Sequence, residues 1–133
     1  MKISTRGRYA LRVMIDIAEH TDGNYIPLKD IADRQNISKK YLESIMLDLT
    51  KAELLDGRHG KGGGYKLKRK AEGYTVFEIL QFAEGDLAPV TCICDKSVGC
   101  ERATECKTLP VWTGFYNLTK QYFSGVTLAD LIK

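Results

Sequence analysis

Residues 27–70 carry the pattern that most constrains the fold: two short helical stretches, a tight turn, and then a basic hairpin rich in glycine. Pro27 suits the first position of a helix over "LKDIADRQ", and Ser38 is a good N-cap for a helix over "KKYLESIMLDLTKA". Between them "QNIS" makes a short turn, and the small Ala32 lets the two helices approach closely. This arrangement is typical of a helix-turn-helix.

The hairpin follows directly. Leu54 and Leu55 have the character of one strand and "YKLK" of another, with a glycine-rich tip carrying Arg58, His59 and Lys61 between them. A basic β-hairpin directly after a helix-turn-helix is a wing, so the pattern predicts a winged-helix DNA-binding domain. "GRHGKGGGY" lacks the spacing of a phosphate-binding loop and leads into a strand, so nucleotide binding is not expected.

The predicted fold is therefore mainly α with a small β-hairpin: a winged helix-turn-helix domain followed by a long C-terminal dimerisation helix. We expect the DNA-binding domain to span 1–72, with the helix-turn-helix at about 27–51 and the wing at about 53–68. Residues 73–133 would then hold a cysteine-rich loop at 92–106 and the dimerisation helix.

Helical spacing also predicts a first helix from Ser4 to about Thr21, a helix over "TVFEILQFAEG" ended by Gly85, and a short closing helix over "TLADLI". The long helix over "TLPVWTGFYNLTKQYFSG" carries a stripe too aromatic for one small domain to bury easily. Core packing is one interpretation, and we favour a homodimer interface, because helix-turn-helix proteins usually bind two half-sites as symmetric dimers. The expected interface residues are Trp112, Phe115, Tyr116, Thr119, Tyr122 and Phe123.

Charge is distributed unevenly along the chain. Residues 1–70 hold 15 Lys and Arg against 9 Asp and Glu, a balance of +6, whereas residues 71–133 hold 5 against 8, a balance of −3. A basic first half suggests a nucleic-acid partner, although a solvated surface with uneven charge would look the same. The opening residues lack a signal peptide and no apolar run reaches membrane-spanning length, so we expect a cytoplasmic protein with no membrane partner.

All four cysteines lie within residues 92–106, and Cys94, Cys100 and Cys106 are separated by five residues each. Structural zinc sites usually draw two ligands from a knuckle with two to four residues between them, so this spacing does not favour zinc. An iron–sulfur cluster is larger and accepts wider intervals between its thiolate ligands. The alternatives are reduced, unligated thiols and a metal-independent thiol switch.

The chain resembles the IscR-type winged-helix regulators over nearly its whole length. The resemblance rests on the opening "MKISTRGRYAL", the helix-turn-helix "IADRQNISKKYLESIM", the wing "RHGKGGGYKL" and the spacing of three cysteines. It implies a transcription regulator or repressor whose operator binding is controlled by an iron–sulfur cluster, with cluster-assembly genes as expected targets. The CymR type, which controls cysteine metabolism, shares the opening but lacks the cysteine triad and is a poorer match.

In the cluster-binding branch of that family, three cysteines at this spacing hold the cluster, which implies Cys94, Cys100 and Cys106 as ligands. IscR-type regulators imply a 2Fe–2S cluster, which we favour, and nitric-oxide-sensing relatives of the NsrR type imply a 4Fe–4S cluster. The histidine that serves IscR as fourth ligand is replaced here by Leu109. The candidate fourth ligands, besides a group from the partner subunit, are Cys92, Asp95 and Glu105.

The second helix of the helix-turn-helix is expected to lie in the major groove of double-stranded DNA, with Arg58 in the minor groove. A solvated helix face and an adaptor that contacts proteins are the alternatives. We find no nucleophile–base pairing and no substrate pocket, so neither an enzyme nor a small-molecule substrate is expected. The residues expected to contact DNA are Ser38, Lys39, Lys40, Tyr41, Glu43, Ser44, Arg58, His59, Lys61 and Gly62.

Overall fold

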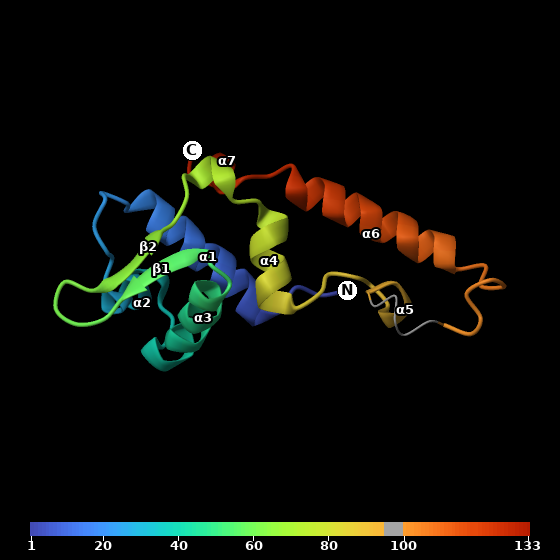
Figure 1. Cartoon of the computed structure of the whole chain (residues 1–133), viewed down its shortest axis with the longest axis horizontal. Helices are drawn as coiled ribbons and strands as arrows, with labels where there is room; N and C mark the ends of the chain where they lie inside the picture. Colours follow the sequence, from blue (N-terminus) through green and yellow to red (C-terminus); the bar gives the residue numbers. More distant parts are fainter. Residues whose placement is uncertain (95–99) are drawn as a thin grey trace.

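The structure is a computed structural model that describes residues 1–94 and 100–133, without the side chain of Cys94. It is mainly helical with one two-stranded antiparallel sheet, which confirms the predicted fold class (Figure 1). In chain order the elements are α1 (Thr5–Glu19), α2 (Leu28–Gln35), α3 (Lys39–Lys51), β1 (Leu55–Arg58), β2 (Gly64–Leu67), the 3-10 turn η1 (Ala71–Gly73), α4 (Val76–Glu84), α5 (Thr91–Cys94), α6 (Leu109–Ser124) and α7 (Leu128–Leu131).

Short-range signals set the helix ends. The Ser4 hydroxyl caps α1 by accepting from the Gly7 N–H at 3.0 Å, and the Ser38 hydroxyl caps α3 by accepting from the Tyr41 N–H at 3.2 Å. Asn36 ends α2 in the left-handed conformation at φ 54°, which asparagine tolerates better than most residues. The helix-turn-helix of α2 and α3 therefore forms where the sequence predicts it.

The wing differs from its prediction at the first strand. β1 begins at Leu55 and continues through Arg58, which pairs with Gly64 of β2 and is therefore the last strand residue rather than part of the tip. Cross-strand hydrogen bonding outweighs the low strand preference of Asp56 and Gly57. Ile26, just before α2, adds an antiparallel bridge to Tyr65 and so joins the wing to the helical body.

The main apolar core lies around α1. It takes buried side chains from α1, α2, α3 and the start of the wing, and Leu128 of α7 closes it from the other end of the chain. The backbone N–H of Leu128 donates to the Tyr74 carbonyl at 2.9 Å, and Thr75 forms a bridge with Thr127. The end of the chain is thus packed against its beginning, and the division at residue 72 remains a prediction.

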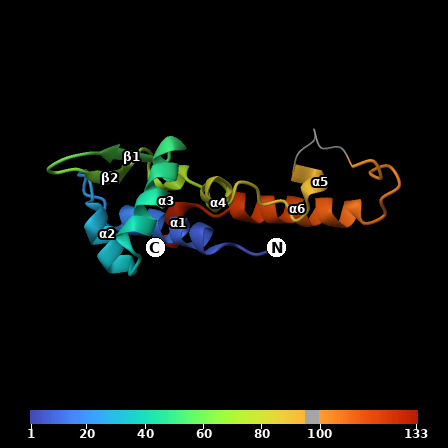
Figure 2. The same cartoon turned by 90° about the horizontal axis from the view of Figure 1, so that it is seen from below.

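A smaller apolar cluster joins α4 to α6. Val76, Leu80 and Leu87 are its buried members, and Tyr116 and Phe123 of α6 pack against them while staying partly exposed. Every residue of α6 is at least partly exposed. The wing and residues 100–108 lie at opposite ends of the molecule, with α6 extending from the body toward the latter (Figures 1 and 2).

Candidate nucleic-acid interface and cysteine segment

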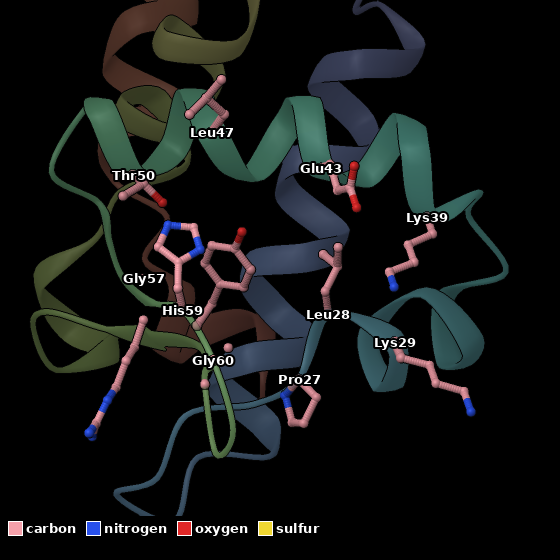
Figure 3. Close-up of a pocket in the computed structure, with 14 residues that line it drawn as sticks. Pro27, Leu28, Lys29, Lys39, Glu43, Leu47, Thr50, Gly57, His59 and Gly60 are labelled. Atoms are coloured by element: carbon pink, nitrogen blue, oxygen red, sulfur yellow. The ribbon is translucent and has the colours of Figure 1, made fainter.

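A groove of about 680 Å³ runs between α3 and the wing (Figure 3). Lys39, Glu43 and Thr50 lie along α3 on one wall, and His59 and Gly60 of the wing form the other. Tyr65 also lines the groove, and burial and the nearby Glu43 carboxylate raise the pKa of its hydroxyl. The groove therefore presents cations, a carboxylate and neutral hydrogen-bonding groups side by side.

The predicted contacts on α3 and its N-cap are accessible to a partner, with the exception of Tyr41. Ser38, Lys39, Lys40, Glu43 and Ser44 are exposed, whereas Tyr41 is half-buried. Its ring meets that of Tyr9 edge-to-face at 5.8 Å between centroids and packs against the main core. Tyr41 thus has a packing role that sequence reasoning did not assign to it. Leu47 also lines the groove although it is 54% exposed, and it was not among the predicted contacts.

The wing holds the remaining predicted residues, with Arg58 exposed at the end of β1. His59, Lys61 and Gly62 are all exposed in the turn. Gly62 has φ 77°, a conformation that side chains with a Cβ rarely adopt. At the base of the wing, the Tyr74 hydroxyl donates to the Leu54 carbonyl at 2.8 Å and accepts from the Lys68 and Arg69 N–H groups. This buried hydroxyl holds the two strands together where they leave the body.

Hydrogen bonds connect the end of α4 with α3 through the first turn of α1. The Glu84 carboxylate accepts from both the backbone N–H and the hydroxyl of Ser4, at 2.8 and 2.7 Å. Two residues later, Arg6 donates to the Ser44 hydroxyl at 3.2 Å and forms an ion pair with Asp48. Ser44, a predicted DNA contact, is therefore held by Arg6 within the chain.

Asp16 is 1% exposed on the apolar face of α1 and was missed by the sequence reading. Arg34 of α2 donates to both of its carboxylate oxygens, at 2.7 and 3.0 Å, and the Gln35 amide donates at 2.8 Å. Burial alone would raise the pKa of Asp16, but these hydrogen bonds and the Arg34 charge outweigh it and lower the pKa. The sequence signal that could have predicted this buried ion pair was a charged residue between Met14 and Ile17 on an apolar helix face.

The cysteines lie at the far end of the molecule from the wing. Cys92 and Cys106 are half-buried, Cys100 is exposed, and all three are free thiols. Of the candidate fourth ligands, Cys92 is half-buried, Glu105 is exposed and Asp95 lies outside the described part of the chain. The side chain of Cys94, one of the three expected ligands, also lies outside it. Among the side chains that the structure describes, no three cysteine, histidine or carboxylate groups are gathered as a metal site.

The surroundings of Cys106 favour the thiolate form of its side chain. It lies three residues before the first residue of α6, and its sulfur is 3.3 Å from the Thr108 hydroxyl. That hydroxyl, the Thr108 and Leu109 N–H groups and the charge of Arg102 lower the pKa of the Cys106 thiol. A depressed pKa fits metal ligation and fits thiol redox chemistry as well.

The predicted interface residues on α6 divide into two groups. Tyr116 and Phe123 face the α4 cluster, and the Thr119 hydroxyl donates to the Phe115 carbonyl at 3.0 Å. The others lie on an exposed stripe that also includes two residues missed from the sequence. We call the set Val111, Trp112, Phe115, Leu118 and Tyr122 the α6 stripe.

Across the residues that the structure describes, no helix is both long and apolar enough to cross a membrane.

Comparisons with known proteins agree with this architecture. Residues 3–133 match the Rrf2 family model, described as an iron-dependent transcriptional regulator. Protein rrf2 of Nitratidesulfovibrio vulgaris is 38% identical over 100% of this chain and 88% of its own length. The transcriptional regulator IscR of Vibrio campbellii is 34% identical over 100% of this chain and 78% of its own length.

A solved structure extends the likeness to the fold. CymR, the global cysteine regulator of B. subtilis, superposes with a TM-score of 0.79 at 32% identity, covering 99% of this chain and 96% of its own. The chain belongs to the Rrf2 family of transcriptional regulators.

Proposed function

We propose that this Rrf2-family chain binds a double-stranded DNA operator as a homodimer and that an iron–sulfur cluster controls the binding. The groove between α3 and the basic wing carries the DNA part of the proposal. Lys39 lines this groove, and it suits phosphates together with the exposed Lys40 of α3 and Lys61 of the wing tip. Glu43 can accept from a cytosine amino group in the major groove.

Cys94, Cys100 and Cys106 are the proposed cluster ligands, with the fourth ligand among Cys92, Asp95, Glu105 or a group of the partner subunit. The lowered thiol pKa of Cys106 and the free thiols of Cys92 and Cys100 support ligation by this segment. Bound there, an iron–sulfur cluster would supply a site sensitive to iron and redox state. We favour 2Fe–2S over 4Fe–4S, a cytoplasmic location, and control of cluster-assembly genes.

The α6 stripe supports the homodimer. Leu118 and Tyr122 are 67% and 68% exposed, and they recur with Val111 and Phe115 on one side of the helix. Exposed apolar side chains in such a continuous stripe favour association with a second copy of the chain. Under two-fold symmetry the same stripe of the second copy would pack against it. Two α3 helices held in one dimer would then bind two half-sites of an operator.

A metal-independent thiol switch is the second candidate. The likeness to CymR and the replacement of the expected histidine by Leu109 favour it. Under this alternative, oxidation of the thiols alone would change DNA affinity.

Anaerobic purification separates the two candidates. The expected result is visible absorption with stoichiometric iron and sulfide, lost when Cys94, Cys100 or Cys106 is replaced by serine and partly kept in Cys92→Ser. Bound zinc without sulfide would overturn the cluster proposal. Iron-free protein whose DNA affinity still responds to thiol oxidation would support the thiol switch.

DNA binding is tested separately by fluorescence anisotropy with mixed genomic duplexes over a range of salt concentrations. Affinity should fall as salt rises because phosphate contacts release counterions. Arg58→Ala should weaken operator binding by about 1–3 kcal/mol, the magnitude of a specific groove contact. Unchanged affinity in a folded variant would contradict the assignment of the wing.

A further inference from the structure

Tyr25, in the segment between α1 and α2, lies against the wing and contacts three of its side chains. Its hydroxyl donates to the Asp56 carboxylate at 2.8 Å. The Lys66 ammonium lies 4.7 Å from the centre of its ring, and the Arg58 guanidinium carbon lies 5.9 Å from it. One aromatic ring thus meets two cations of the predicted DNA-binding hairpin.

The strand register explains why these groups meet. Asp56 pairs directly with Lys66 across the hairpin, and Arg58 follows Asp56 by two residues, so all three share one face. The opposite face carries Leu55, Tyr65 and Leu67, which pack on the body. Tyr25 therefore lies against the face of the wing that carries Arg58 and Lys66.

The backbone around Tyr25 does not depend on this side chain. The neighbouring Ile26 exchanges two backbone hydrogen bonds with Tyr65, each 2.9 Å long, and its own side chain is buried. Tyr25 is half-exposed and belongs to neither apolar cluster within the described chain. A substitution at Tyr25 should leave the fold and the position of the wing intact.

We propose that Tyr25 is a positioning residue for DNA binding, whose ring orients Arg58 and Lys66 for the DNA. A free arginine or lysine loses rotamer freedom when it binds, and a cation held over an aromatic face has already lost part of it. The Tyr25 hydroxyl also engages Asp56, the carboxylate best placed to compete with DNA for these two cations. In the described part of the chain, neither Arg58 nor Lys66 forms an ion pair.

This inference rests on the proposed DNA binding by the wing, and a double-mutant cycle tests both. The probe is the tightest duplex selected from a random-sequence pool, and affinity is measured by fluorescence anisotropy. Tyr25→Ala should weaken binding about three- to tenfold, the cost of reordering one or two long side chains. Tyr25→Leu, which keeps apolar bulk without a π face, should lose as much, whereas Tyr25→Phe should keep most of the affinity.

In the Arg58→Ala Lys66→Ala background, the effect of Tyr25→Ala should disappear. Lys61→Ala is the matched control, because Lys61 lies in the same hairpin outside the contacts of Tyr25, so its effect should add to that of Tyr25→Ala. Unfolding temperatures should stay unchanged across the set, and the Nε–H group of Arg58 should become more mobile in Tyr25→Ala by NMR relaxation.

Three results would overturn the inference while leaving DNA binding by the wing in place. They are wild-type affinity in Tyr25→Ala, an equal loss in the Arg58→Ala Lys66→Ala background, and a loss in Tyr25→Phe as large as in Tyr25→Ala. If Arg58→Ala Lys66→Ala itself binds as tightly as the wild type, the wing assignment and the inference both fail.

Discussion

The helix-turn-helix body and α6 are built in opposite ways. Helices α1, α2 and α3 each bury one face in a shared core, where Leu42 and Ile31 are 0% exposed. Helix α6 is longer than any of them, yet all of its residues stay at least partly exposed, and the α6 stripe belongs to neither apolar cluster of the described chain. The body covers its own apolar faces, whereas α6 presents apolar surface that a partner would need to cover. Substitutions on α6 and in the body test this difference, and two further substitutions test polar contacts that hold the body together.

The largest effect is expected from charge on the α6 stripe. Val111→Glu combined with Leu118→Glu should weaken dimerisation by about 4 kcal/mol or more, because unpaired carboxylates would be buried in the interface. Sedimentation should show a folded monomer. Thr113→Glu, on an exposed position of α6 off the stripe, is the control and should stay dimeric. A dimer that survives the double substitution would place the interface elsewhere.

The second largest effect is expected from truncating a buried side chain in the body. Leu42→Ala removes a fully buried side chain and should lower the free energy of unfolding by about 3 kcal/mol through lost burial and a cavity. Urea denaturation measures the change. Leu118→Ala, made in a Val111→Glu background at concentrations where the chain is monomeric, should change the free energy of unfolding by under about 0.5 kcal/mol. Equal costs at the two positions would remove the contrast between the body and α6.

A smaller effect is expected from the ion pair inside the body. Asp16→Asn should lower stability at neutral pH by about 1 kcal/mol, a modest value because Arg34 is a third exposed and can turn to water. The folded pKa of Asp16 lies below its ordinary value of 3.8, so its contribution is present above about pH 4 and is lost as pH falls through the folded pKa.

Denaturation as a function of pH measures this contribution. In Asp16→Asn, the free energy of unfolding should lack the part of the decrease with falling pH that the wild type shows below about pH 4. Asp33→Asn, at an exposed position of α2, is the control and should keep it. The same acid dependence in wild type and Asp16→Asn would contradict the role of Asp16.

The smallest effect concerns the link between the body and the segment that leads to the cysteines. Glu84→Gln replaces a charged acceptor by a neutral one for two Ser4 donors and should cost about 0.5 kcal/mol, since both donate to the same oxygen and an amide oxygen there can still accept them. Hydrogen exchange at the first turn of α1 is the sensitive measurement. Glu19→Gln, at an exposed carboxylate of the same fold, should leave that exchange unchanged.

Features that depend on neighbouring residues were predictable from the sequence. Ser38 as the cap of α3, Gly85 as the end of α4 and the wing after the helix-turn-helix are confirmed, because caps and turns are decided within a few residues. The family resemblance also came from contiguous motifs, and the Rrf2 match confirms it. The cluster ligands and the domain boundary remain predictions.

Only the tertiary structure decided which side of a helix or strand has a partner. Tyr116 and Trp112 read alike in the sequence, yet the position of α4 covers part of one and leaves the other in the α6 stripe. Asp16 looked misplaced on an apolar face until Arg34 was brought to it from another helix. Nothing in the sequence distinguishes Tyr25 from other loop residues, and only the strand pairing shows that Arg58 and Lys66 lie against its ring. Caps and turns are local in the chain, whereas burial and charge pairing depend on contacts between distant residues, which only the folded chain brings together.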